Sequence, residues 1–389
     1  MKPKVIIIIL NWNGWQHTIE CLRSLFHTDY DNYRVILVDN ASTDDSLGKI
    51  EAYCANELKL SSFVADDLVR NKPTTVVHYA KEDAEPGADR SGAVAQHIDI
   101  ALTVMQNGQN YGFAEGNNIA VAYALDISNP DYVLLLNNDT VVEKNFLAQL
   151  VNAAEHDGQI GLLQPKILRY VDSTIESTGF MCNTLAYSQP RGFNEKDEGQ
   201  YDNDKEDGFF YASGACVLIK KSLLAALSGE CFDPHLFAYY EDVDLSWMAR
   251  LIGLKVVYCP ESVCYHKGKG SFGDETPLTV YLSHRNRLRV MIKNYSLATL
   301  IFVLPLTIVL KFSLLVVDCI VNLDPSYLLS FLKALVWNVL NLQSALVLRM
   351  RIQSKRKLHD EEIMNYMNPY SFRVHTALKH HWKRRKGES

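Results

Sequence analysis

The segment "YVLLLNNDT" (132–140) places three polar side chains, Asn137, Asn138 and Asp139, directly after an apolar run. Such a run followed by polar residues is typical of a buried strand and its exit. A strand that ends in Asp-x-Asp presents two carboxylates to a divalent cation and a diphosphate, because Mg²⁺ prefers oxygen ligands. Here the amide of Asn137 replaces the first carboxylate. The segment is therefore either a metal and nucleotide site with one carboxylate, or a polar turn.

A second group of acids stands in "LFAYYEDVDLSWMARLIG" (236–253), at Glu241, Asp242 and Asp244. Acids in the first turn of a helix are favoured by the helix dipole, which explains them without any chemistry. The aromatic residues before them predict a half-buried pocket, and burial raises the basicity of a carboxylate, as a general base requires. Arg250, two turns further along the same helix, is expected to be structural.

Asp39 closes an apolar run in "ILVDNASTD". It is either an N-cap for the next helix, a task that Ser42 could serve equally, or an acceptor for the imide N–H of a pyrimidine base. Downstream, "QNYGFAEGNNIA" (109–120) leads into a helix, with Gly112 and Gly116 allowing a close approach to the backbone. Helix starts of this kind suit anions, although the start of a helix alone also explains the glycines.

His266 follows an apolar run in "CYHKGKGS" (264–271). A lone histidine is more often structural, but one that precedes a cationic loop is well placed to contact a phosphate or a metal. Lys269 and Ser271 of this loop are candidates for a diphosphate or acceptor contact. In "SHRNRLRVMIKNY" (283–295), Arg285 either reaches a diphosphate or anchors the chain beside a membrane.

The elements that must position these residues alternate along the first half of the chain. Apolar runs at 4–10, 33–39, 97–105 and 132–137 are followed by helical patterns at 15–26, 42–54, 113–125 and 143–155. This alternation predicts an α/β fold with a mostly parallel sheet that helices cover on both faces. Ligands bind at the carboxyl ends of such strands, so we expect the polar strand exits to converge in one crevice: Asn11, Asn13, Asp39, Asn40, Asn107 to Asn110, and Asn137 to Asp139.

Two stretches depart from this rhythm. Residues 56–96 show little periodicity and are expected to form a surface insertion. Residues 158–270 mix the strand patterns "GLLQPKIL", "GACVLIKK" and "KVVYCPE" with a helix at 239–251.

The segments 296–321 and 327–348 are apolar, and a basic tail occupies 349–389. The two apolar segments are expected to form a helical hairpin that spans a membrane or lies on its surface. The alternative is a pair of helices packed on the domain or in a homo-oligomer.

Global composition narrows the class of protein. A formal net charge of −6 and a pI near 6.1 argue against a nucleic-acid partner. Eight scattered cysteines without a zinc spacing are expected to be free thiols in a reducing compartment. The N-terminal apolar run is too short for a signal peptide, so the catalytic part is expected on the cytoplasmic side.

Seven blocks, in order, resemble the inverting family-2 glycosyltransferases of the GT-A fold, especially their rhamnosyltransferase-like branch. The blocks are "VIIIILNWNG", "VILVDNASTDDS", "NYGFAEGNN", "LLLNNDT", "ASGACVLIKKSLL", "FAYYEDVDLSWMARLIGLKV" and "YHKGKGS". The resemblance covers residues 4–295 and implies a Rossmann-like GT-A domain over 1–295, with a nucleotide-binding half at 1–140 and an acceptor half at 141–295. That branch often carries Asn-x-Asp where others carry Asp-x-Asp.

The resemblance also implies roles for individual residues. Asp242 would be the catalytic base with Glu241 beside it, and Asp139 with His266 would contact Mg²⁺ or Mn²⁺. The nucleotide would be bound by Asn11, Asn13, Asp39, Asn110, Gly112, Asn137 and Asn138, with Asp39 on the pyrimidine.

The implied function is metal-dependent transfer of a sugar, with inversion, to a lipid-linked or cell-surface polysaccharide acceptor at the cytoplasmic face of the cell membrane. The expected donor is dTDP-L-rhamnose. Two alternatives stay open: the same fold using UDP-galactofuranose or a UDP-N-acetylhexosamine, and a non-catalytic protein that binds a glycan or a partner.

Overall fold

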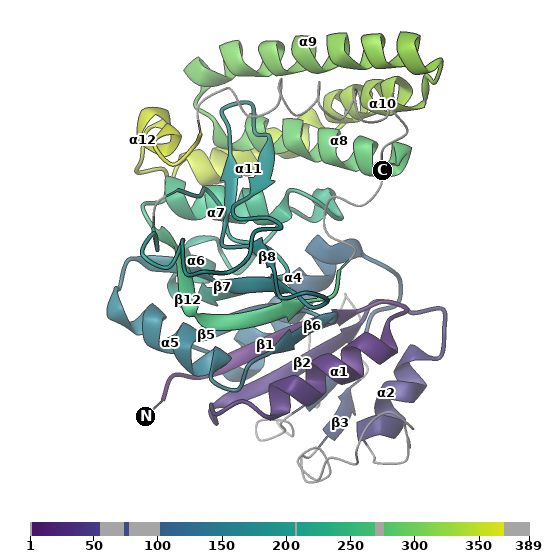
Figure 1. The fold of residues 1–389 in the computed structure, drawn as a ribbon. Helices are drawn as coiled ribbons and strands as arrows, with labels where there is room; N and C mark the ends of the chain where they lie inside the picture. Colours follow the sequence, from purple (N-terminus) through teal and green to yellow (C-terminus); the bar gives the residue numbers. More distant parts are fainter. Residues whose placement is uncertain (1, 55–73, 78–101, 207, 269–275, 369–389) are drawn as a thin grey trace.

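The fold is built around one large, mostly parallel sheet, as the alternating pattern predicts (Figure 1). The computed structural model describes residues 2–54, 74–77, 102–206, 208–268 and 276–368. The sheet has the strand order β3-β4-β2-β1-β5-β11-β7-β12-β6, with β8 paired to β7. Its first five members are parallel: β3 (Thr74–Val77), β4 (Leu102–Gln106), β2 (Tyr33–Asp39), β1 (Val5–Asn11) and β5 (Tyr132–Asn137). β3 is an edge strand inside the expected insertion, whose other residues lie outside the described ranges.

Side chains of the central strands point alternately into two cores, one on each face of the sheet. Ile7 and Ile9 pack with α1 (Trp15–Phe26) and α5 (Phe146–His156). Ile6 and Ile8 pack with α4 (Gly112–Ser128) and α7 (Glu241–Leu251). This double coverage explains why the strands are continuously apolar instead of alternating.

The second half of the chain supplies the remaining strands. β7 (Ile160–Arg169), β11 (Cys216–Lys220) and β12 (Lys255–His266) confirm the three predicted strand patterns, and β12 extends far enough to carry His266. β6 (Thr140–Val142) pairs with the end of β12, and β8 (Ile175–Ser177) pairs with β7. A small hairpin of β9 (Phe180–Cys182) and β10 (Ser188–Pro190) stands apart from this sheet. The remaining short elements here are α6 (Lys221–Ala226) and a 3₁₀ turn, η3 (Pro234–Leu236).

The helix predicted at 42–54 begins later in the structure. α2 (Ser46–Cys54) starts where the Asp44 carboxylate accepts a hydrogen bond from the Ser46 backbone N–H at 3.0 Å. Ser42 is held away from the helix because its hydroxyl donates to Asp39 at 2.6 Å. Asp39 is therefore not the N-cap of this helix.

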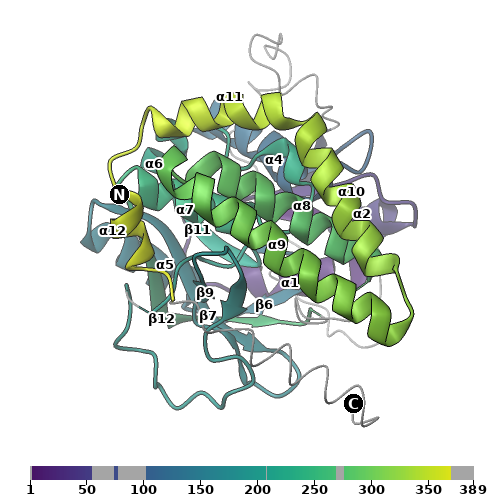
Figure 2. The ribbon, with the colours of Figure 1, turned by 90° about the horizontal axis from the view of Figure 1, so that it is seen from above.

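Helices form a separate layer above the sheet (Figure 1). α8 (Pro277–Asn294) packs on α7, where Lys293 and Asn294 both bind the buried Asp244 carboxylate. α10 (Ser326–Leu340) packs on α8 through the fully buried Phe331, and its Asn338 side chain donates to the Arg285 carbonyl at 2.9 Å. Viewed from above, α9 (Leu297–Asn322) runs across this layer (Figure 2).

The second apolar segment is not one continuous helix. α10 and α11 (Leu342–Gln353) meet at Asn341 with their axes bent by 66°, and α12 (Asp360–Met364) follows. Among the described residues, α9 is the helix that by itself is long and apolar enough to cross a membrane, and α10 with α11 qualifies only as a bent pair.

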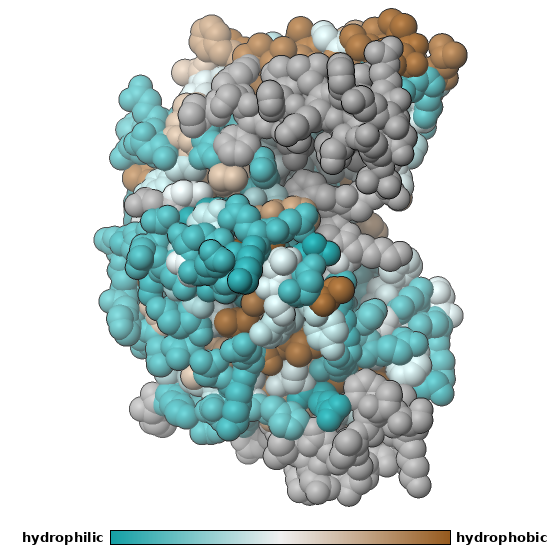
Figure 3. All heavy atoms as spheres, in the orientation of Figure 1, coloured by the Kyte–Doolittle hydropathy of each residue, from teal (hydrophilic) through white to brown (hydrophobic). Residues whose placement is uncertain are grey.

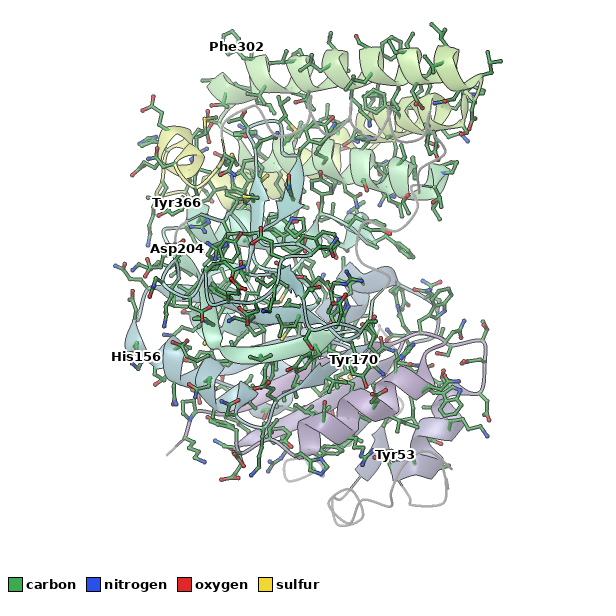
Figure 4. The ribbon with its side chains drawn as sticks, in the orientation of Figure 1. Tyr53, His156, Tyr170, Asp204, Phe302 and Tyr366 are labelled. Carbon is green, nitrogen blue, oxygen red and sulfur yellow. The ribbon has the colours of Figure 1, made fainter. Side chains whose placement is uncertain are left out.

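The outward side of α9 and α10 is apolar, whereas polar Thr307 of α9 is buried (Figure 3). Phe302 illustrates this orientation on the outer side of α9 (Figure 4). We call the exposed apolar side chains of the two helices the outer apolar surface: Leu297, Ile301, Phe302, Leu306, Val309, Leu310, Phe312, Leu314, Val317, Ile320, Val321, Leu329, Leu332, Val336, Val339 and Leu340.

Candidate active site

The polar exits of the parallel strands meet at one edge of the sheet, as expected. The register pairs Asn11 with Asp39 and Leu10 with Asn137, so three strands end level with one another. The Asn11 amide donates to Asp39 Oδ1 at 3.0 Å, and the Ser42 backbone N–H donates to Asp39 Oδ2 at 3.1 Å. Asp39 is thus held at the end of β2, and among the described residues its Oδ2 accepts a single hydrogen bond.

An asparagine network shapes the neighbouring loops. The Asn40 amide donates to Asn110 Oδ1 at 2.9 Å and to the Gly112 carbonyl at 3.1 Å, and Asn107 donates to Asn40 Oδ1 at 2.9 Å. Asn13 accepts from the backbone N–H of Thr43 at 2.7 Å. These amides hold the loops around Asp39, which is a positioning task.

Trp12 was not among the residues predicted from the sequence. It lies between Asn11 and Asn13 at the exit of β1, and 54% of it is exposed. A large exposed indole beside the buried Asp39 offers a flat apolar face next to a hydrogen-bond acceptor. The sequence signal that could have identified Trp12 is a tryptophan at the end of a strand, where its ring has no core to pack into.

The side chains of the Asn-Asn-Asp segment make different contacts. The Asn138 amide donates to the Thr18 hydroxyl at 3.0 Å and so ties the segment to α1. The Asp139 side chain is 25% exposed, and its Oδ1 lies 3.1 Å from His266 Nε2. The pairing of β6 with β12, which places His266 opposite Thr140, brings these two side chains together.

A second carboxylate orients His266 from behind. Glu176 of β8 binds His266 Nδ1 at 2.7 Å, and both side chains are 8% exposed. Burial would lower the pKa of His266, but the hydrogen bonds and charges of Asp139 and Glu176 outweigh it and raise the pKa to about 10. Burial likewise opposes the ionisation of Asp139, and His266 overcomes this, so the pKa of Asp139 lies below its ordinary value. Glu176 was missed because "TIESTG" contains no local signal of a site.

This arrangement fits a divalent cation. Glu176 occupies Nδ1 of His266 and leaves Nε2 directed at Asp139, which is the second-sphere pattern of metal-binding histidines. No group of three or more His, Cys, Asp or Glu side chains that could hold a metal ion occurs in the described part of the chain. Asp139 and His266 would therefore supply only part of the coordination, as is usual for Mg²⁺ bound together with substrate phosphates.

The three acids at the start of α7 have distinct environments. Asp244 is fully buried in its ion pair with Lys293 and is structural. Asp242 is partly exposed, with Oδ2 accepting from the Gly214 backbone N–H at 3.2 Å, and burial raises its pKa to about 6. Burial and the adjacent Asp242 raise the pKa of Glu241 well above its ordinary value. At neutral pH Asp242 is thus an ionised carboxylate of raised basicity beside Glu241, whose pKa is also raised.

The residues before these acids form a strained segment, which we call the base loop (Phe237, Ala238, Tyr239 and Tyr240). Phe237, Tyr239 and Tyr240 have φ values of 61°, 73° and 71°, which cost about 1–3 kcal/mol each for a non-glycine residue. The loop closes over the start of α4, where the Phe237 carbonyl accepts from the Phe113 N–H at 2.7 Å. Gly112 is required here because its φ is +73° and a Cβ would lie 2.5 Å from the Phe237 ring.

The remaining predicted contacts lie elsewhere or outside the described residues. Arg285 is buried, and its guanidinium donates to the carbonyls of His235 at 2.9 Å and Leu236 at 2.8 Å, just before the base loop. Lys269 and Ser271 fall outside the described ranges. Lys267 pairs with Glu20 and lies 4.6 Å from the ring centre of Tyr170, beside α1 (Figure 4). Arg250 donates to the Phe210 carbonyl at 2.8 Å, in keeping with a structural role.

Residues 3–291 match a family model described as "Glycosyltransferase like family 2". The chain is a family-2 glycosyltransferase. This assignment makes it an enzyme, and the matched residues include every described strand.

Three relatives of this glycosyltransferase are named as sugar transferases. It is 24% identical over 254 residues to the low-salt glycan biosynthesis hexosyltransferase Agl10 of Haloferax volcanii, covering 60% of this chain and 79% of Agl10. It is 26% identical to the rhamnosyltransferase WbbL of Escherichia coli over 41% of this chain and 62% of WbbL. It is 25% identical to the N-acetylglucosaminyl-diphospho-decaprenol L-rhamnosyltransferase of Mycobacterium tuberculosis, over 58% of this chain and 78% of that enzyme.

Solved structures agree on the GT-A fold of the glycosyltransferase. Residues 1–349 of S. aureus TarS, crystallised with UDP-GlcNAc, superpose with a TM-score of 0.51 at 15% identity, covering 93% of this chain and 89% of TarS. GalNAc-T7, crystallised with UDP, GalNAc and Mn²⁺, also gives 0.51 at 15% identity, covering 75% of this chain and 48% of GalNAc-T7.

Proposed function

We propose that this enzyme transfers L-rhamnose from dTDP-L-rhamnose to a hydroxyl group of a lipid-linked or polysaccharide acceptor, with inversion at the anomeric carbon. The observation that carries the proposal is Asp242, a partly buried carboxylate with a pKa of about 6 that accepts a hydrogen bond from Gly214, two residues before β11, the strand paired with β5. Two of the relatives described above are named rhamnosyltransferases, and the name of one specifies a sugar linked to a polyprenol through a diphosphate.

The nucleotide would occupy the first half of the crevice. Asp39 Oδ2, which holds a single hydrogen bond in the described structure, is suited to accept the imide N–H of a pyrimidine base. Trp12 would stack on the same base. Thymine and uracil share this imide group, so UDP-galactofuranose or a UDP-N-acetylhexosamine is the second candidate donor.

A divalent cation, Mg²⁺ or Mn²⁺, would be held by Asp139 and His266. When bound, it neutralises charge on the diphosphate as the bond to the sugar breaks. Glu176 would hold the Nδ1–H group of His266 when a cation takes the place of the Nε2 proton.

The residues of the chain then perform a single displacement. Asp242 accepts the proton of the acceptor hydroxyl. At the same time the hydroxyl oxygen of the acceptor forms a bond to the anomeric carbon, from the face opposite the diphosphate. The bond between that carbon and the diphosphate oxygen breaks, and the nucleoside diphosphate leaves with the electron pair. Single attack inverts the anomeric centre, and no covalent intermediate with the protein is formed.

We also propose that the outer apolar surface lies in the cytoplasmic face of the cell membrane. An exposed apolar area of this extent marks an interaction site, and α10 is pinned to α8 by Phe331 and Asn338. α9 packs on the same layer, so its 26 residues, about 39 Å long, would lie flat in the interface. The basic tail sequence "KHHWKRRKG" suits an anionic lipid surface.

The test combines binding with transfer. Purified protein is screened for thermal stabilisation by dTDP, UDP, GDP and their sugars, with Mn²⁺ or with EDTA, because a ligand that binds only the folded state raises its stability. We expect stabilisation by dTDP or UDP with Mn²⁺, and transfer from dTDP-L-rhamnose to a short-chain prenyl diphosphate that carries N-acetylglucosamine. Absence of binding by every nucleotide would overturn the enzymatic proposal, and transfer only from a UDP-sugar would replace rhamnose by the second candidate.

A further inference from the structure

We propose that Phe237 and Tyr239 of the base loop form a stacking platform for the acceptor sugar; this inference rests on the proposed function. Both rings are large and exposed, at 41% for Phe237 and 40% for Tyr239. The third aromatic residue of the loop, Tyr240, is anchored instead, because its hydroxyl donates to the Ala186 carbonyl at 2.9 Å. The loop therefore presents two aromatic side chains outward and uses the other as a support.

The backbone shows that these side chains are retained against a structural cost. Phe237, Tyr239 and Tyr240 all have positive φ, a conformation that glycine adopts without strain. A segment that needed only to turn the chain into α7 would be more stable with glycine at Phe237 or Tyr239. Strain of this kind is kept where the side chain serves a site.

The surroundings hold the loop in this conformation. The Asn286 Nδ2 lies 2.7 Å from the carbonyl oxygens of Leu236 and Tyr239 and 2.8 Å from that of Ala238. Arg285 binds the preceding turn from the same helix. The backbone that carries the two rings is thus held in place, which lowers the entropy lost when a ligand binds to them.

The positions of Phe237 and Tyr239 indicate which substrate they contact. Phe237 lies over Gly112 at the edge of the nucleotide half, and Tyr239 lies three residues before the base Asp242. The proposed donor site has its own exposed aromatic residue, Trp12, directly after β1. The molecule next to the base must be the one that loses a proton to it, and that is the acceptor. The apolar face of a pyranose ring, with its axial C–H groups, matches an aromatic surface of this kind.

The phenol of Tyr239 adds a hydrogen-bonding group to this platform. Burial and the neighbouring Glu241 raise its pKa, so the hydroxyl stays neutral and can donate to an acceptor oxygen. Phe237 and Tyr239 both contribute an aromatic ring to the platform, and the Tyr239 hydroxyl contributes separately to acceptor binding.

Glycine variants provide the test, because they remove the ring while relieving the backbone. In the full-length enzyme, Phe237→Gly and Tyr239→Gly should raise KM for the short-chain prenyl diphosphate N-acetylglucosamine about 10- to 100-fold, the usual effect of removing an aromatic stacking partner. Tyr239→Phe keeps the ring and should stay within about threefold of the wild type. In both glycine variants KM for the donor should change much less than KM for the acceptor. Phe302→Gly, which removes an exposed ring on α9, is the matched control and should leave KM for this acceptor unchanged.

The outcomes separate this inference from the proposed function. If the wild type binds nucleotide and transfers sugar while both glycine variants keep the wild-type KM for the acceptor, the platform is refuted and the proposed function stands. If the glycine variants raise KM for the donor instead, the rings belong to the donor site and the inference is wrong. A wild type that neither binds nucleotide nor hydrolyses the donor overturns the proposed function and the platform together.

Discussion

Two adjacent carboxyls at the start of α7 both have raised pKa values. Burial raises the pKa of Asp242 to about 6, and burial with the charge of Asp242 raises that of Glu241 well above its ordinary value. Neighbouring carboxyls in different environments are a usual way to create one base. The pair therefore predicts how transfer and stability respond to pH.

Transfer should depend on the ionised form of Asp242. We expect kcat/KM to rise about tenfold per pH unit below pH 6 and to level off above it. Asp242→Asn should lower kcat by about 10²–10⁴-fold while leaving nucleotide affinity unchanged, as measured by initial rates and calorimetry. Loss of nucleotide binding in this variant would assign Asp242 to the donor site and remove it as the base.

The same substitution should stabilise the fold. The pKa of Asp242 rises from an ordinary 3.8 to about 6, so the folded state binds its proton more tightly than the unfolded state. Stability from this group is therefore complete below pH 3.8 and decreases as pH rises to 6. Asp242→Asn should gain about 1–3 kcal/mol in free energy of unfolding at pH 7, measured with urea. A variant that is less stable than the wild type at pH 7 would contradict the raised pKa.

Glu176 gives a prediction about the cation. Removing the carboxylate behind His266 by Glu176→Ala should weaken Mn²⁺-dependent binding of the nucleoside diphosphate about 10- to 100-fold. Affinity measured calorimetrically in EDTA should not change, and Glu176→Gln, which keeps an acceptor for Nδ1–H, should lose less. Glu195→Gln, in an exposed loop, is the control. Equal losses with Mn²⁺ and with EDTA would show that Glu176 supports the fold alone.

Single residues differ in how far their role is visible in the sequence. Asp39, Asp139 and Asp242 were predicted as site residues because each follows a strand or opens a helix, which are local patterns. Glu176 contacts His266, 90 residues away, and the Arg285 guanidinium binds the turn before the base loop, about 50 residues away. Those contacts are set by packing, which residue spacing does not encode.

At the scale of elements, α8 connects two regions of the molecule. Its Asn286 and Arg285 hold the base loop, and the Arg285 guanidinium also lies 4.5 Å from the Trp337 ring of α10. Arg289 is paired with the buried Asp233 in front of η3. One helix thus supports both the catalytic segment and the layer that carries the outer apolar surface.

Asn286→Ala tests this support. The amide lies near three carbonyl oxygens of a strained loop, so its loss should cost about 2–4 kcal/mol of free energy of unfolding in urea. Transfer should fall further than stability alone explains, because the base is no longer held. Ser283→Ala on the same helix is the control. A change in stability within about 0.5 kcal/mol would mean that other contacts hold the loop.

Regular elements were largely predictable and their interruptions were not. The strands at 33–39 and 132–137 and the helix at 15–26 match their predicted ranges, because continuous apolar runs and helical periodicity are strong signals. The late start of α2 follows from the Ser42 hydroxyl donating to Asp39 and accepting from the Asn11 amide, 31 residues away, which helical periodicity does not register. The bend at Asn341 lies inside the segment 327–348, whose scattered polar residues do not mark a break.

At the scale of the whole molecule, the sheet and its crevice lie beneath a helical layer whose far side is apolar (Figure 3). If that side lies in a membrane, charge placed on it should release the protein. We expect Phe302→Glu with Val309→Glu to lower binding to anionic phospholipid vesicles at least about tenfold in sedimentation assays.

A charge at an exposed apolar residue elsewhere provides the comparison. Val171 is 84% exposed in the turn between β7 and β8, and Val171→Glu should leave vesicle binding unchanged. Transfer to the short-chain acceptor should be equal in all three proteins. Unchanged binding by the double variant would indicate that the outer apolar surface packs against protein instead of lipid.

The outer apolar surface also governs how the purified protein behaves. In a buffer without detergent, two copies can shelter these side chains only against each other. Light-scattering or sedimentation masses should then fall toward that of a single chain when a mild detergent is added. A dimer seen only in detergent-free buffer would report the covering of exposed side chains, so the physiological assembly is best measured on protein bound to lipid nanodiscs.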